Sequence, residues 1–175
     1  MAHEFFSKKR LGFTLIEVLI AISIIGIFGA VSGVIFSSVI RSYNKTQVTA
    51  ELEQNGNYVL SILEQQIRNA KDVSVHGNEI WIEPQTGTTI IYGFQVPENG
   101  ANGYLYKGAE KTPMTNQNPV SGISVVACTF NVYSSDPKTV TITLDVQQGE
   151  NASEKKDFTG TASLKTTVVV RGGYN

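Results

Sequence analysis

The feature that most constrains this chain is an apolar run from Phe13 to Ile40 that contains one charged residue, Glu17. At a rise of about 1.5 Å per residue, a helix of this length reaches roughly 40 Å, more than the ~30 Å hydrocarbon core of a bilayer. The run is too long for the apolar part of a secretory signal peptide, and no A-x-A cleavage site follows it. A soluble domain can bury an apolar helix, but hydrophobicity this nearly unbroken favours a membrane-spanning segment.

The charges that flank the run indicate its orientation. Lys8, Lys9 and Arg10 precede it, whereas Arg41 and Lys45 follow it and weaken the bias slightly. Because cytoplasmic flanks of membrane helices carry an excess of Lys and Arg, we expect the N-terminus to be cytoplasmic. The sequence therefore predicts a single-pass protein of the cytoplasmic (inner) membrane whose C-terminal body is periplasmic or extracellular.

Glu17 is the one residue that a plain membrane anchor would not need. A charge near the bilayer centre costs about 2.5–3.5 kcal/mol on insertion scales, and less toward the headgroups. The carboxylate could lie shallow and reach the headgroups, which would explain why it is tolerated but not why it is there. An ionisable residue within such a segment favours a function for Glu17.

The stretch KKRLGFTLIEVLIAISIIGIFGAV resembles the N-terminal signature of type IV pilins and of the pseudopilins of type II secretion systems. The family pattern is a short basic leader, Gly, Phe, a Thr-Leu pair, an apolar residue and Glu, followed by a long apolar helix. The resemblance implies that a prepilin peptidase cuts between Gly12 and Phe13 and N-methylates Phe13. It also implies an assembly role for Glu17, whose carboxylate would pair with the new Phe13 amine of the same or a neighbouring subunit in a filament.

The same resemblance implies further partners, namely other pilin or pseudopilin subunits and an inner-membrane assembly platform. Before assembly the helix would lie in the membrane. Many major pilins have a proline in the later part of the apolar run, where this chain has Val34 and no proline at all. This departure favours a minor pilin or pseudopilin that initiates or caps a type IV pilus-like filament of a secretion, pilus or competence system.

Within the family, the stretch 52–70 and the closing LKTTVVVRG are similar to J-type minor pseudopilins and related minor pilins. Two other interpretations stay open. The chain could be a major pilin that forms the filament shaft, or a membrane-tethered binding domain or enzyme that uses a generic anchor.

Beyond Ile40 the pattern becomes that of an amphipathic helix that continues to about Ala70, with Gly56 as a point where it could bend. The apolar residues at helical spacing are Val48, Leu52, Val59, Leu63 and Ile67. We expect an α+β, pilin-like fold in which this half of a long N-terminal helix packs on an antiparallel sheet. The expected parts are a leader (1–12), a membrane and assembly helix (13–40) and a head (41–175).

Alternating apolar and polar residues predict the strands of the head. VACTFNVY and TVTITLDVQ are expected to form a hairpin around SSDPK, with ASLKTTVVVR as a further strand. Shorter strands are expected at EIWIEP, TTIIYGFQV and GYLYKG. One face of the first strand should carry Val126, Cys128, Phe130 and Val132.

The head offers no convincing catalytic or metal-binding cluster. His3 and His76 have no Cys, Asp or Glu at ligand spacing, and the single cysteine, Cys128, lies among apolar neighbours typical of a core. Trp81 with its flanking glutamates could suggest a sugar site, but an edge or partner-facing aromatic fits a short strand better. The mildly acidic body also lacks the clustered Lys and Arg that nucleic acid requires. We therefore expect no catalytic residue, metal or cofactor, and no enzyme.

Overall fold

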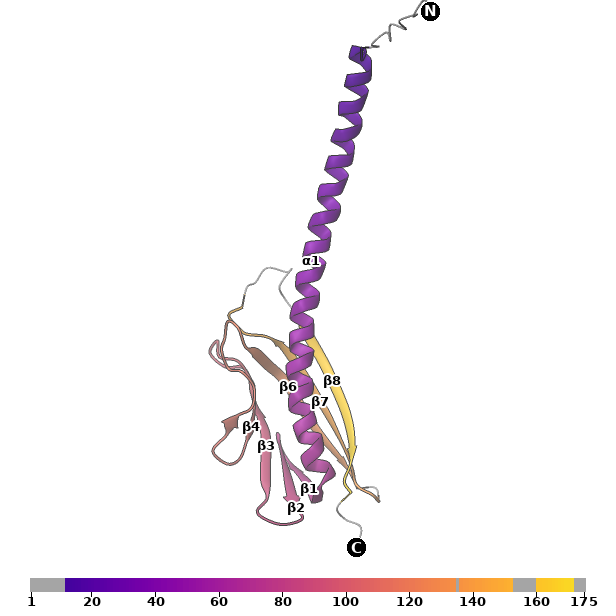
Figure 1. Cartoon of the computed structure of the whole chain (residues 1–175). Coiled ribbons are helices and arrows are strands. Elements are labelled where there is room, and N and C mark those ends of the chain that lie inside the picture. Colours follow the sequence, from indigo (N-terminus) through magenta and orange to yellow (C-terminus); the bar gives the residue numbers. More distant parts are fainter. Residues whose placement is uncertain (1–11, 135, 153–159, 172–175) are drawn as a thin grey trace, which may run out of the picture. The chain divides into compact units, whose positions relative to one another are not determined.

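Figure 1 shows the computed structural model of the chain, which describes residues 12–134, 136–152 and 160–171. One helix, α1 (Leu15–Arg68), is followed by strands that account for most of the remaining described residues. The strands are β1 (Ala70–His76), β2 (Glu79–Pro84), β3 (Ile90–Gln95), β4 (Tyr104–Lys107), β5 (Thr112–Pro113), β6 (Ile123–Tyr133), β7 (Thr139–Gln148) and β8 (Thr161–Val169). A long N-terminal helix packed on antiparallel strands confirms the predicted pilin-like α+β class.

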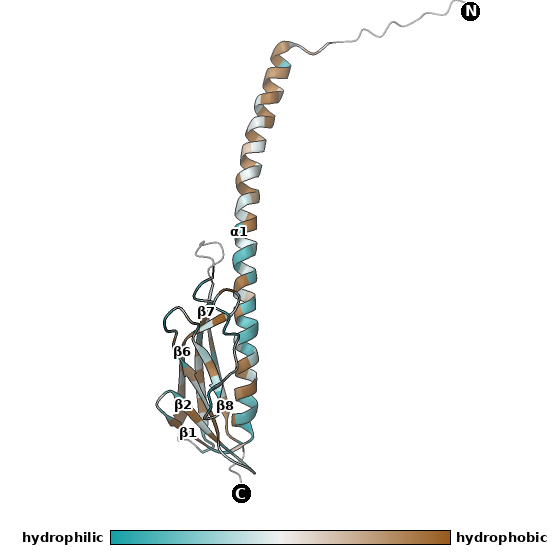
Figure 2. Ribbon diagram, turned by 90° about the vertical axis from the view of Figure 1, so that its left-hand side faces the viewer, coloured by the Kyte–Doolittle hydropathy of each residue, from teal (hydrophilic) through white to brown (hydrophobic). Residues whose placement is uncertain are grey.

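The chain forms two compact units, residues 1–41 and 42–175. In its described part the first unit is the apolar half of α1, and its side chains are exposed. Figure 2 shows brown and white along this half, with teal becoming frequent further along the helix. The helix is long and apolar enough to cross a membrane, and none of the candidate spanning stretch is buried. The leader expected at residues 1–12 lies outside the described residues, apart from Gly12.

The second unit contains two antiparallel sheets, although the sequence predicted one. Strands β1 to β5 form one sheet in that order, and β6 to β8 form the other. Within each sheet, every strand pairs with the next along the chain, so neither sheet needs a crossover connection. The expected hairpin of β6 and β7 is present, and β6 also lies against β1, β3 and β4, which brings the two sheets together.

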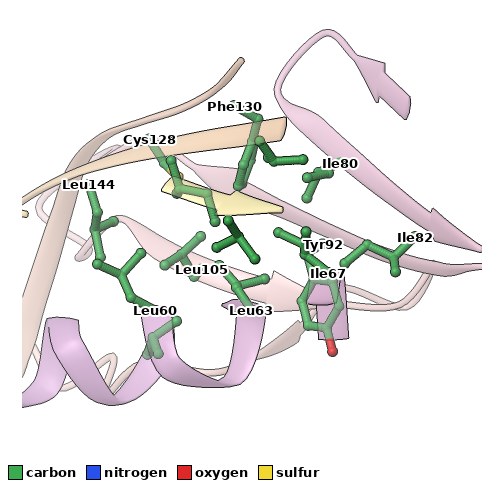
Figure 3. Packing of buried hydrophobic residues seen from close by; sticks show 14 of the residues in the cluster. Leu60, Leu63, Ile67, Ile80, Ile82, Tyr92, Leu105, Cys128, Phe130 and Leu144 are labelled. Carbon is green, nitrogen blue, oxygen red and sulfur yellow. The ribbon is translucent and has the colours of Figure 1, made fainter. Parts of the chain in front are cut away.

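The second half of α1 supplies the centre of the core. Figure 3 shows Leu60, Leu63 and Ile67 facing buried side chains that come from both sheets. The predicted stripe is confirmed, since Leu52, Val59, Leu63 and Ile67 are at most 2% exposed and Val48 packs against them. Full burial of one such side chain contributes about 1.5–3 kcal/mol, so this stripe is a main source of stability for the head.

Gly56 is a packing position rather than a bend. The helix continues through it, and Gly56 is buried. A Cβ atom added there would lie 2.2 Å from Leu164 Cδ1 and 3.8 Å from Leu144 Cδ2. The missing side chain therefore lets the helix backbone approach β7 and β8 closely.

The predicted face of β6 is wrong at one position. Cys128 and Phe130 point into the core as predicted, but Val126 is 43% exposed and Val125 is fully buried in its place. The pairing of β6 with β7 shifts register between Val125 and Ala127. A β-bulge adds one residue to a strand and so inverts the alternation on one side of it, which a simple period of two cannot foresee.

Removal of the buried hydroxyl of Tyr92 should stabilise the head. Tyr92 is 1% exposed, and its hydroxyl has no hydrogen-bond partner among the described residues. Because an unpaired buried polar group costs about 1–3 kcal/mol, Tyr92→Phe should raise the free energy of unfolding of fragment 42–175 by about 1 kcal/mol in urea. Tyr58→Phe, at a residue 63% exposed, is the matched control and should change little. A loss of stability in Tyr92→Phe would contradict the assignment.

Candidate functional site

The N-terminal end of α1 presents an open stretch of backbone. Gly12, Phe13 and Thr14 lie before the first helical residue and outside regular structure. Phe13 is 87% exposed, and a Cβ atom added at Gly12 would meet nothing within 4 Å. Within the described part of the chain, the Gly12–Phe13 peptide bond is therefore accessible to another protein.

Thr14 and Glu17 form a reciprocal cap on the first turn of α1. Thr14 donates to Glu17 Oε2 from its backbone N at 2.9 Å and from its hydroxyl at 3.0 Å. In return, Glu17 N donates to Thr14 Oγ1 at 3.3 Å, and Val18 N donates to the Thr14 carbonyl at 3.3 Å. This is a capping box, in which a Thr and the Glu three residues later satisfy each other's backbone N–H groups. A carboxylate in the first turn also matches the positive end of the helix dipole.

The capping role of Thr14 was not predicted from the sequence. Its pattern, T-x-x-E in front of an apolar run, is visible in TLIE and could have been identified as a capping box. The structure brings Thr14 and Glu17 together, whereas no hydrogen bond links Glu17 with Phe13 in the described chain. The carboxylate thus has a local partner in the single subunit.

The rest of the first unit has a continuous apolar surface that is unfavourable in water. Large apolar side chains from Phe13 to Ile40 are between 45% and 87% exposed. Exposed apolar surface of this extent marks a contact with lipid or with other protein. The glycines at 26, 29 and 33 lie on this open surface, where an added Cβ atom would meet nothing within 4 Å.

A second cluster lies around Trp81, on the side of β2 opposite the core. Glu79 Oε1 accepts a hydrogen bond from the Tyr106 hydroxyl at 2.7 Å, and Glu79 Oε2 accepts one from Trp81 Nε1 at 3.1 Å. The Trp81 and His76 ring centroids are 4.7 Å apart, and Lys71 Nζ lies 2.9 Å from Glu83 Oε1. Each polar group of this cluster therefore already has a partner within the head.

The pKa shifts in this cluster favour an ionised Glu79 carboxylate, held in place by its hydrogen-bond donors, over a proton-donating acid. The hydrogen bonds from Tyr106 and Trp81 keep the pKa of Glu79 below its usual range. Burial, followed by the bond to Glu79, raises the pKa of Tyr106 to about 12. An ionised carboxylate and a neutral phenol at physiological pH fix the geometry of the sheet surface. Neither is poised near neutral pH for proton transfer.

Loops 97–103 and 108–122 are tied to the rest of the head by buried polar side chains. Asn102 Nδ2 donates to the Asn118 carbonyl at 2.8 Å, and its Oδ1 accepts from Glu150 N at 2.8 Å. Ser124 donates to Glu150 Oε1 at 2.7 Å and accepts from Gly103 N at 3.1 Å. Asn102 and Ser124 are at most 3% exposed, so these bonds give the loops a fixed shape.

Cys128 and the histidines do not combine into a metal site. Cys128 is a core residue as predicted, and its burial raises the pKa of the thiol to about 12. His76 ends β1, and His3 lies outside the described residues. In the portion of the chain that the structure describes, no three His, Cys, Asp or Glu residues are placed to share a metal ion.

Comparison with known families finds a match at the N-terminal end of the chain. Residues 7–33 match the prokaryotic N-terminal methylation motif, which includes Gly12, Phe13, Thr14 and Glu17. No curated protein and no solved structure matches the chain.

The matched motif implies processing by a prepilin peptidase and assembly with other pilin subunits in general. Together with the exposed apolar helix, it indicates a protein anchored in the inner membrane. Proteins that carry it are typically structural subunits rather than enzymes. The chain thus carries, at residues 7–33, the N-terminal methylation motif that is typical of type IV pilins and pseudopilins, in front of a pilin-like α+β fold.

Proposed function

We propose that this protein is a minor pilin or pseudopilin, a structural subunit that initiates or caps a type IV pilus-like filament. The filament would belong to a type II secretion, pilus or competence system. The observation that carries the proposal is the Thr14–Glu17 capping box, which starts an exposed apolar helix directly after the open Gly12–Phe13 bond.

Cleavage between Gly12 and Phe13 is the first step of the proposed function. A glycine without neighbours lets a peptidase close on the extended backbone just outside the helix. Hydrolysis of the peptide bond would leave a carboxylate on Gly12 and an amine on Phe13. In its neutral form this amine would take a methyl group from a methyl donor bound by the peptidase, with release of the demethylated donor and a proton. The leader would stay on the cytoplasmic side, while the head lies in the periplasm or outside the cell.

The second step is assembly through Glu17. Both hydrogen bonds from Thr14 reach Oε2, and Oε1 has no partner among the described residues. Oε1 can therefore accept a hydrogen bond from a Phe13 amine while the cap stays in place. An opposite charge brought next to a carboxylate in a dry interior is attracted far more strongly than in water. A buried carboxylate left without a partner is costly, so assembly without the amine would be disfavoured.

The minor role rests on features of the sequence and of the head. The apolar run Phe13–Ile40 has no proline, unlike many shaft-forming subunits. The fixed loops 97–103 and 108–122 and the exposed edge of Trp81 offer surfaces for protein contacts. A J-type minor pseudopilin is the subgroup we propose, on the resemblance of stretch 52–70 and of the closing strand. The assembly platform of the inner membrane would be a further partner.

Processing at Gly12 is directly measurable. When the full chain is produced together with a prepilin peptidase, intact-mass spectrometry should show a protein that begins at Phe13 and carries one added methyl group. The same chain produced without the peptidase is the control and should keep its leader. A chain that still begins at Met1 after recruitment into filaments would contradict the proposal.

Variants of Glu17 distinguish its proposed ion pair with the Phe13 amine from its capping hydrogen bonds with Thr14. Glu17→Gln keeps an oxygen that can accept from Thr14 but carries no charge, whereas Glu17→Ala loses both functions. Both variants should insert into the membrane, and both should be recruited into filaments at least about tenfold less than wild type, because the amine partner is lost. Thr14→Ser, which keeps the capping hydroxyl, is the control and should assemble normally.

Fractionation of filaments followed by immunoblotting provides this measurement. Normal recruitment of Glu17→Gln together with failure of Glu17→Ala would show that only the cap matters. Normal recruitment of both variants would count against any role of Glu17 in assembly.

Copy number distinguishes the minor subunit from the alternative, a major pilin. Quantitative mass spectrometry of purified filaments should find far fewer copies of this protein than of the main subunit. Deletion of its gene should reduce the number of filaments, or secretion, because initiation becomes inefficient. Filaments made mostly of this protein would assign it to the shaft instead.

A further inference from the structure

Strand β8 provides a long sheet edge that nothing in the described chain covers. The other three edges are closed or short. Strand β5 has two residues, one of them Pro113, and β1 and β6 lie against each other where the two sheets meet. By contrast, β8 extends over nine residues and pairs only with β7.

The hydrogen-bond pattern shows which backbone groups of β8 point outward. At the two ends of the β7–β8 ladder, Gln148 N donates to the Gly160 carbonyl at 3.4 Å and Val170 N donates to the Lys138 carbonyl at 2.9 Å. In an antiparallel pair, residues alternate between bonding to the partner strand and pointing away from it. Even-numbered residues of β8 therefore bond to β7. The outward N–H and C=O groups belong to Thr161, Ser163, Lys165, Thr167 and Val169.

The outer edge of β8 lacks most of the structural features that prevent an exposed strand from pairing with another strand. Natural proteins protect edges with proline, bulges, charges or very short strands. The β7–β8 pairing runs from Thr139↔Val169 to Gln147↔Thr161 without a register shift, and β8 contains no proline. The side chains of the five outward residues are exposed, and Lys165 is the single charge among them.

The position of Lys165 argues against pairing with a second copy. Lys165 is the middle residue of β8, so two copies paired antiparallel about this centre would place the two lysines opposite each other. Like charges directly opposite on a sheet are destabilising. Within the described head, Lys165 lies across from Thr143 and forms no ion pair with an acidic residue. An acidic side chain on an incoming strand would supply one.

We propose that β8 accepts an extended segment of a different filament subunit by β-strand addition, with an Asp or Glu of that segment opposite Lys165. The added strand would bond to the outward amides and carbonyls of Thr161 to Val169 and extend the three-stranded sheet. This inference rests on the proposed function, because it assumes that the chain meets other pilin-type subunits.

The test uses the full chain in cells that contain the complete filament system. Lys165→Pro removes an outward N–H without breaking a bond to β7, and proline is tolerated at sheet edges for this reason. Lys165→Glu keeps the backbone and reverses the charge, and Lys165→Thr only removes the charge. Recruitment into filaments should fall at least about tenfold for Lys165→Pro and Lys165→Glu, and less for Lys165→Thr.

The controls separate this inference from the proposed function. Leader removal should be normal in every variant, and Glu17→Ala serves as the reference for lost assembly. If Glu17→Ala fails to assemble while Lys165→Pro and Lys165→Glu are recruited like wild type, the strand inference is overturned and the proposed function stands. If wild-type protein is never processed or recruited, the proposed function itself fails. Should Lys165→Pro not fold, Lys165→Glu alone decides between these outcomes.

Amide hydrogen exchange gives an independent, residue-specific check. In the free protein in detergent, the amides of Leu164 and Thr166 should exchange slowly and those of Lys165 and Thr167 quickly. In the purified complex with other subunits, the second pair should become protected as well. Unchanged exchange of Lys165 and Thr167 in the complex would refute strand addition. In sedimentation of the free protein, a dimer that Lys165→Pro abolishes would overturn the choice of partner in favour of a second copy.

Discussion

The packing of the second half of α1 on both sheets is the interaction on which the rest of the head depends. The two sheets share few strand contacts with each other, and the side chains of α1 between Leu52 and Ile67 fill the space that both inner faces enclose. With one free cysteine in the core and no metal cluster in the described residues, this apolar packing must supply most of the stability. The close approach at Gly56 is part of the same arrangement, because it brings the helix onto β7 and β8.

Periodicity predicted those parts of the fold that follow a regular spacing. The apolar stripe of α1 was predicted correctly, because the helix keeps one period throughout. The bulge in β6 and the division into two sheets were not predicted, because they depend on contacts between distant strands. Gly56 was misread for a similar reason, since the residues that approach it, Leu164 and Leu144, lie far along the chain.

In the candidate site, too, the features set by neighbouring residues could be predicted from the sequence, and those set by distant strands or other subunits could not. Gly12, Phe13 and Glu17 were predicted from a short contiguous motif, which lies within the matched residues 7–33. The cap by Thr14 is also local, and its T-x-x-E spacing was available in the sequence. The partner proposed for Glu17 Oε1 cannot follow from one chain when it belongs to a neighbouring subunit. Similarly, the free edge of β8 is defined only once all other strands have been placed.

The two proposed contacts, one through the N-terminal helix and one through the edge of β8, differ in how selective they would be. Such a combination suits a subunit that is added early or at one end of a filament. The exposed helix surface from Phe13 to Ile40 and the proposed Glu17 pairing do not involve the head, so they would supply affinity without selecting one subunit over another. An edge strand with a single lysine instead selects one partner by charge and register. Two contacts in one continuous chain act together, because binding at the first raises the effective concentration of the second. If both proposals hold, a weak, selective strand contact would determine which neighbour the protein takes, while the helix would hold it in the filament.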